Sequence, residues 1–160
     1  MGLFGRKIAI LNLDGRTKVE VRNKKEAEFY AKQLLKCCYE STELVNKTKK
    51  PRVFFERYNF LIKETENLAQ LEKFLKFKGR TPSVTLLYLK KSKEKETNTM
   101  IERAWDDLSI KLTKLKTNKG KENNINKLYQ EFDQYKNEMT ESNIDLYNSY
   151  YNTFINNIWF

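Results

Sequence analysis

The sequence predicts an all-α protein: an elongated antiparallel bundle of about five helices with a small N-terminal β-hairpin. Only two prolines and five glycines interrupt its 160 residues, which favours long helices over a β fold with many turns. Apolar residues recur at intervals of three and four over most of the chain, as in amphipathic helices. The segment 7–22 alternates instead, so it is expected to form strands. The length is consistent with a single helical domain over residues 1–160.

The hairpin over residues 7–22 is expected to turn at Asp14-Gly15, because this dipeptide suits the positive φ angles of a type I′ turn. A two-residue loop would place four β-branched side chains on one face, with Ile8 opposite Val21 and Ile10 opposite Val19. Two strands alone are marginally stable in water. The hairpin must therefore pack on the helices or pair with a partner's strand, and we expect packing.

The first helix is expected over residues 23–46, because Asn23 followed by Glu26 resembles a capping box. The second is expected over residues 51–78. Pro51 suits the first turn of a helix, and Gly79 suits a left-handed stop after its end. The apolar stripe of this long second helix places Leu61 and Leu68 in the main core and calls for a long antiparallel partner.

Three further helices are expected over residues 82–117, 124–138 and 141–158. Thr81 and Thr140 are suitable N-caps for the first and last of them. The charged stretch 90–99 can remain helical through ion pairs between successive turns, whereas residues 118–124 are expected to bend. Trp105 is expected at the edge of the core. The last helix is rich in weak helix formers and should depend on tertiary contacts.

The residue types exclude most common classes of catalytic site. Histidine is absent, which excludes His-based triads and His-containing zinc sites. Neither a glycine-rich phosphate loop nor a Gly-x-Ser-x-Gly elbow is present. Cys37 and Cys38 are adjacent in a predicted helix, a geometry that disfavours a disulfide between them, so reduced thiols are expected.

One acidic cluster is a candidate metal site: Glu102, Asp106 and Asp107, of which Glu102 and Asp106 are four residues apart on one face of a helix. A hard cation needs more oxygen ligands than these, and ion pairs with Arg103 or Lys111 explain the charges equally well. We therefore expect no enzymatic activity, no catalytic residue, no metal and no cofactor. No apolar run approaches the ~20 residues that span a bilayer, so a cytoplasmic protein without a membrane span is expected.

The net charge of +10 is unevenly distributed, because residues 1–120 carry 28 Lys/Arg against 15 Asp/Glu and residues 121–160 carry 3 against 6. Antiparallel pairing of the helices that begin at 51 and 82 would gather a candidate nucleic-acid-binding set: Lys47, Lys49, Lys50, Arg52, Lys111, Lys114, Lys116, Lys119 and Lys121. A second basic group would lie at the opposite end: Lys76, Lys78, Arg80, Lys90 and Lys91. Concentrated positive charge favours phosphate backbones, acidic membranes or acidic proteins. The alternative is that these lysines only solvate the bundle.

Several short motifs carry a resemblance: 1–7 (MGLFGRK), 51–58 (PRVFFERY), 71–74 (LEKF), 81–83 (TPS), 114–117 (KLKT) and 138–141 (EMTE). Together they resemble a family of small uncharacterised helical proteins of Gram-positive bacteria and their mobile elements, including phages and prophages. The resemblance covers most of residues 46–145. It implies a bacterial, soluble, mostly helical protein and brings no known activity or functional residues.

These observations lead us to expect a non-enzymatic interaction protein, a protein-binding adaptor or inhibitor of phage or mobile-element type. It would use the hairpin edge or the aromatic C-terminal helix to bind its partner. The alternative is a nucleic-acid-binding accessory protein that contacts the phosphate backbone through its lysine clusters. A protein partner is thus expected, nucleic acid is the alternative partner, and homo-oligomerisation is left open.

Overall fold

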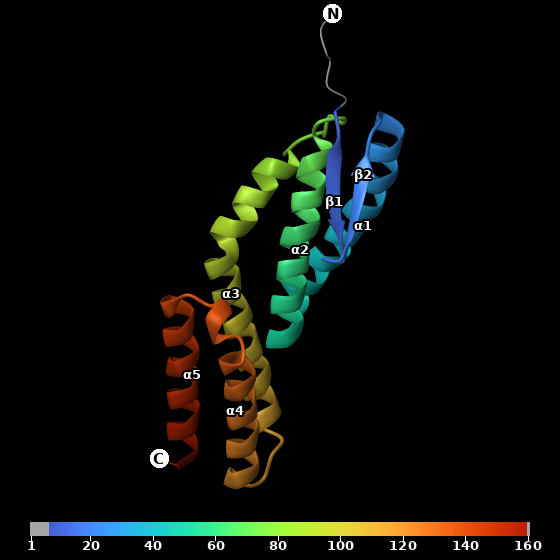
Figure 1. The fold of residues 1–160 in the computed structure, drawn as a ribbon. Helices are drawn as coiled ribbons and strands as arrows, with labels where there is room; N and C mark the ends of the chain where they lie inside the picture. Colours follow the sequence, from blue (N-terminus) through green and yellow to red (C-terminus); the bar gives the residue numbers. More distant parts are fainter. Residues whose placement is uncertain (1–6, 160) are drawn as a thin grey trace, which may run out of the picture. The chain divides into compact units, whose positions relative to one another are not determined.

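The structure is a computed structural model that describes residues 7–159, and it consists of helices preceded by one hairpin (Figure 1). The hairpin is formed by β1 (Ala9–Leu13) and β2 (Thr17–Val21). The helices are α1 (Lys24–Lys47), α2 (Pro51–Leu71), α3 (Pro82–Leu112), α4 (Asn118–Asp133) and α5 (Glu141–Trp159), with a short 3₁₀ turn at Lys136–Glu138. The prediction of five helices with an N-terminal hairpin is confirmed for this part of the chain.

The described residues form two compact units. The N-terminal unit contains the residues up to Glu43 together with Tyr58–Lys91. The C-terminal unit contains Leu44–Arg57 together with the residues from Ser92 onward. The helices α1, α2 and α3 contribute residues to both units.

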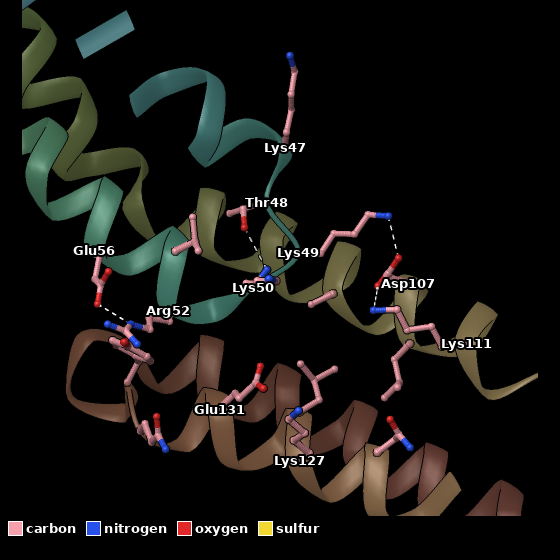
Figure 2. Close-up of a pocket in the computed structure, with 17 residues that line it drawn as sticks. Lys47, Thr48, Lys49, Lys50, Arg52, Glu56, Asp107, Lys111, Lys127 and Glu131 are labelled. Atoms are coloured by element: carbon pink, nitrogen blue, oxygen red, sulfur yellow. Dashed lines mark hydrogen bonds and ion pairs between the residues drawn. The ribbon is translucent and has the colours of Figure 1, made fainter. Parts of the chain in front are cut away.

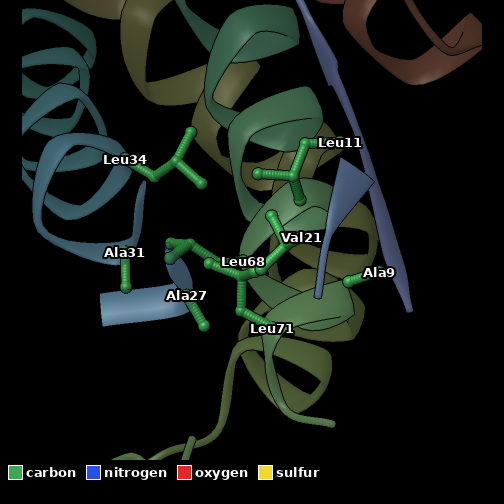
Figure 3. Packing of buried hydrophobic residues seen from close by; sticks show 8 residues of the cluster. All are labelled: Ala9, Leu11, Val21, Ala27, Ala31, Leu34, Leu68 and Leu71. Carbon is green, nitrogen blue, oxygen red and sulfur yellow. The ribbon is translucent and has the colours of Figure 1, made fainter. Parts of the chain in front are cut away.

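The core of the N-terminal unit lies where the hairpin packs on α1 and α2 (Figure 3). Its buried residues are Ala9, Leu11, Val21, Ala27, Ala31, Leu34, Leu68 and Leu71. Packing of the hairpin on the helices is therefore confirmed. The side chain of Asn67 on α2 also bonds the main chain of β1, because its Oδ1 accepts from the Asn12 N–H at 2.9 Å and its Nδ2 donates to the Asn12 carbonyl at 3.0 Å.

The register of the hairpin differs from the prediction by one residue. Leu13 pairs with Thr17 and Leu11 with Val19, so the loop has three residues instead of two. Asp14 and Gly15 both have positive φ, as expected. Because a slip of one residue turns every side chain of a strand to the other face, Ala9 and Leu11 are buried, whereas Ile8 and Ile10 are exposed.

Helix α2 ends at Leu71, well before the expected end at 78. The aromatic and aliphatic residues that follow, Phe74, Leu75 and Phe77, pack on the core of the N-terminal unit. The turn is held to the start of α3 because the Glu72 carboxylate accepts from the Ser83 N–H at 2.7 Å and the Ser83 hydroxyl at 2.8 Å. Gly79 has the expected positive φ of 77°, but it lies in the connection to α3 and not at the helix end.

The two cysteines of α1 are free thiols, as expected. Burial raises the pKa of Cys38 to about 11, and the Thr65 hydroxyl lies 3.9 Å from its sulfur. Thiol reactivity depends on the thiolate. Cys38 is therefore a packed, protonated side chain and not a nucleophile at neutral pH.

The core of the C-terminal unit is built around Trp105 on α3, which is completely buried. Its indole stacks near Phe132 of α4 and Tyr150 of α5, with centroid distances of 6.5 and 6.0 Å. The prediction that Trp105 lies at the core edge is wrong, because α4 and α5 both place aromatic rings against it. Phe154 of α5 completes this packing at 5.0 Å.

Helix α3 is continuous through the charged stretch 90–99, as expected, but it ends at Leu112 instead of 117. Helix α4 begins at Asn118, where a bend was expected, because the Thr117 hydroxyl accepts from the Gly120 N–H at 3.1 Å and caps its first turn. The glycine therefore lies in a capped first turn and not in a loop. At α5, the predicted cap is confirmed, because the Asn143 N–H donates to the Thr140 hydroxyl at 3.3 Å.

Candidate nucleic-acid interface

A hollow of about 1060 Å³ lies in the C-terminal unit, between the α1–α2 connection and α4 (Figure 2). The connection and the first turns of α2 form one side, α3 contributes residues 104–111, and α4 forms the other side. Six basic side chains line it: Lys47, Lys49, Lys50, Arg52, Lys111 and Lys127. Three carboxylates also line it: Glu56, Asp107 and Glu131. We call this cavity, with its six basic and three acidic side chains, the basic hollow.

The α1–α2 connection is held in place by Arg103 of α3. Its guanidinium donates to the carbonyls of Val45 at 3.1 Å, Thr48 at 2.9 Å and Asn46. The planar fork of arginine suits several acceptors at once, and these carbonyls belong to the C-terminal end of α1 and the residues after it. The backbone that carries Lys47, Lys49 and Lys50 is thus fixed to α3.

Two of the lysines converge on one carboxylate. Lys49 Nζ lies 2.8 Å from Asp107 Oδ1, and Lys111 Nζ lies 2.7 Å from Asp107 Oδ2 (Figure 2). Hydrogen bonds from Lys111 and then Lys49 lower the pKa of Asp107 below its ordinary value, so this carboxyl group is ionised at neutral pH. Arg52 is paired with Glu56 at 2.9 Å.

The structure brings five of the nine candidate residues to the hollow: Lys47, Lys49, Lys50, Arg52 and Lys111. The other four lie on the connection after α3 or on the first turn of α4: Lys114, Lys116, Lys119 and Lys121. In Figure 2 the side chain of Lys47 points away from the other labelled cations. Residues from both parts of the candidate set, those before residue 53 and those after residue 110, thus reach the hollow, but Lys111 is the only one of the later group among its lining residues.

Lys127 was missed by the sequence-based prediction. It lies on α4 and lines the hollow together with Leu128 and Glu131. The usable signal was spacing, because Lys127 and Glu131 are four residues apart and so share one face of the helix beside the apolar Leu128.

The second basic group lies in the N-terminal unit and is partly engaged by other side chains. Lys90 Nζ lies 3.7 Å from Glu66, and the guanidinium of Arg80 lies 4.8 Å from the centre of the Tyr88 ring. A cation over an aromatic ring is stabilised by the negative face of that ring. Lys49, Arg52 and Lys111 of the basic hollow are engaged in ion pairs as well. The basic hollow is the stronger candidate because cations from separate segments gather around one cavity there.

In the acidic cluster at residues 102–107, the carboxylate of Asp107 is paired with two lysines. Asp107 pairs with Lys111, as one alternative anticipated, whereas Arg103 turns to backbone carbonyls instead of the carboxylates. Among residues 7–159, the structure contains no group of three or more Cys, Asp or Glu side chains placed to hold a metal ion.

No family model, curated protein or solved structure matches the chain. Within residues 7–159, none of the helices combines the length and the apolar character that crossing a membrane requires.

Proposed function

We propose that this is a non-enzymatic binding protein whose basic hollow binds the phosphate backbone of nucleic acid. The observation that carries the proposal is that three separate segments bring cationic residues to one hollow that also holds three carboxylates: Lys49, Lys50 and Arg52, then Lys111, and then Lys127. Lysines that merely solvate a helical surface need not converge from the α1–α2 connection, α3 and α4.

Duplex DNA is the probe for this proposal, because its backbone presents a dense and regular row of phosphates. The hollow is open and lined by flexible ammonium groups, which neutralise phosphates without reading base edges. The sequence contains no helix-turn-helix or other base-reading motif. Binding should therefore depend on salt and have little sequence preference. If about five phosphates are neutralised, the logarithm of the affinity should fall against the logarithm of salt concentration with a slope near −4 to −5.

The test compares two double variants with the same change in charge. Lys50→Glu with Lys127→Glu alters the basic hollow, whereas Lys76→Glu with Lys78→Glu alters the second basic group in the N-terminal unit. Fluorescence anisotropy with a labelled duplex should show at least ~10-fold weaker binding for the first pair and about twofold or less for the second. Circular dichroism checks that both remain helical. Equal losses for the two pairs would refute a localised site.

The second candidate function, a protein-binding adaptor or inhibitor, is supported by the exposed side chains at the start of α3. Val84, Leu87 and Tyr88 are 51%, 59% and 52% exposed and lie at helical spacing on one face. Arg80 and Lys91 flank them and are also exposed. The occupant that fits is an amphipathic helix of a partner protein with acidic residues beside its apolar stripe.

The two functions predict different effects of one substitution. Leu87→Ser should leave DNA affinity unchanged, because Leu87 lies in the N-terminal unit and outside the basic hollow. In the adaptor function it should reduce binding to an acidic amphipathic helical peptide, as measured by calorimetry. Lack of binding to such a peptide by the wild-type protein would remove the second candidate.

A further inference from the structure

Asp107 occupies the point at which two lysines of the basic hollow converge. Each of its carboxylate oxygens accepts from a different ammonium group, Oδ1 from Lys49 at 2.8 Å and Oδ2 from Lys111 at 2.7 Å. Its side chain is only 19% exposed. The two lysines come from different segments, the α1–α2 connection and α3, so the carboxylate links that connection to α3 (Figure 2).

This carboxylate has the recognition chemistry of the proposed ligand. A phosphodiester and an ionised carboxylate each carry one negative charge over two accepting oxygens. Lysine ammonium groups bind both at about 2.7–2.9 Å. A phosphate that binds Lys49 and Lys111 must therefore either displace Asp107 from these lysines or share them with it.

We propose that Asp107 is a built-in competitor for the phosphate-binding lysines of the basic hollow, and that it limits the affinity for a phosphodiester chain. This inference rests on the proposed function. With Asp107 in place, Lys49 and Lys111 offer one net positive charge to a ligand; without it they offer two. A single phosphate gains little by displacing the carboxylate. A phosphodiester chain can displace the carboxylate because its other phosphates simultaneously contact residues such as Lys50 and Lys127.

The test is the removal of this one charge. Asp107→Asn should bind duplex DNA about three- to tenfold more tightly at 100 mM salt, the range expected when two ion pairs no longer compete. Its salt slope should be steeper by about 0.9, because one further phosphate is neutralised. Asp107→Ser provides a second variant with a smaller neutral side chain, and it should change the affinity in the same direction.

The matched control is Asp106→Asn, one residue earlier on α3, which makes the same change in net charge. Asp106 is exposed and does not line the basic hollow, so its loss should change the affinity by less than about twofold and leave the slope unaltered. Thermal unfolding checks that each variant remains folded.

The outcomes separate this inference from the proposed function. If the wild type binds and Asp107→Asn is no tighter than Asp106→Asn, the competitor role is overturned and backbone binding stands. If Asp107→Asn and Asp107→Ser both bind DNA more weakly than the wild type, the competitor role is also overturned, because Asp107 then holds the lysines in position for the ligand. Absence of binding by the wild type and by Asp107→Asn at 50 mM salt would overturn both proposals.

Discussion

Leu68 is the residue that best tests the core of the N-terminal unit, because it is 3% exposed and packs among the hairpin residues and α1. Leu68→Ala should lower the free energy of unfolding by about 2–5 kcal/mol through lost transfer energy and a residual cavity. Urea unfolding measures the loss. Leu35→Ala on α1 is the matched control, since Leu35 is 49% exposed, and it should cost less than about 0.5 kcal/mol. Similar costs for the two would place Leu68 outside the cooperative core.

Glu64 should make stability depend on pH, because it is buried on α2. Burial raises its pKa above the ordinary value of 4.5, the negative charge of Asp14 adds to this, and a hydrogen bond from Asn67 opposes it. The folded state therefore holds the proton more tightly than the unfolded state. The contribution of Glu64 is most favourable below about pH 4.5 and is lost as pH rises through the folded-state pKa.

Glu64→Gln removes this titration while it keeps the size and the hydrogen-bonding oxygen of the side chain. At pH 7–8 the variant should be more stable than the wild type, and the difference should close as pH falls toward about 4.5. Urea midpoints measured across this range provide the test. Parallel pH profiles for the two proteins would show that Glu64 is not responsible.

At the scale of the element, α5 is the helix that depends most on its neighbours, because Asn, Tyr, Ser and Thr dominate its sequence and are weak helix formers. Asn143 provides its main polar anchor. Its Nδ2 donates to the Glu94 carbonyl at 3.0 Å and to Asn98 Oδ1 at 2.7 Å, and its Oδ1 accepts from the Thr140 N–H at 3.1 Å.

Amide exchange should therefore be faster in α5 than in the other helices, and Asn143→Ala should accelerate it further. The loss of these buried bonds should cost about 1–3 kcal/mol. The control is Asn152→Ala, an exposed position of the same helix, which should leave exchange unchanged or slower because alanine favours helix. Protection in α5 equal to that around Leu61 on α2 would contradict the expectation.

The elements themselves were predictable from periodicity, but their ends depended on tertiary contacts. The dipeptide Asp14-Gly15 located the turn, but the register depends on which face of β1 packs on the helices. Ile8 and Ile10 are more apolar than Ala9, so the sequence favoured the face that the structure leaves exposed. Helix α2 ends at Leu71, and Phe74 and Phe77 pack on the core of the N-terminal unit from the segment that follows it. No local signal distinguishes these contacts from a continued helix.

The candidate site was predictable only in part, for the same physical reason. Antiparallel pairing was enough to bring Lys49 and Lys111 to one end of the helices. That both lysines meet at Asp107, and that Lys127 approaches from α4, depends on helix packing and side-chain direction. Charge patterning identifies which residues are basic, whereas the structure determines which of them share a site.

At the scale of the whole molecule, the fold should not require a metal. Histidine is absent from the sequence, and two adjacent cysteines cannot complete a tetrahedral site. EDTA should leave the circular-dichroism spectrum and the melting temperature unchanged. A fall of about ten degrees would show that metal binding contributes to folding, since removal of a structural ion costs the free energy of its binding.

The two hydrogen bonds between the Asn67 side chain and the Asn12 main chain also affect how the protein behaves at high concentration. A two-stranded sheet has two edges, and free main-chain groups along an edge can template pairing with a strand from another molecule. The Asn67 amide engages both the N–H and the carbonyl of Asn12, and Lys73 donates to the carbonyl of Ile8 at 3.2 Å. These bonds from α2 and from Lys73, just after the helix, occupy main-chain groups that could otherwise pair with a strand of another molecule. We expect them to reduce edge-to-edge aggregation, to which the exposed apolar side chains of Ile8 and Ile10 would otherwise contribute.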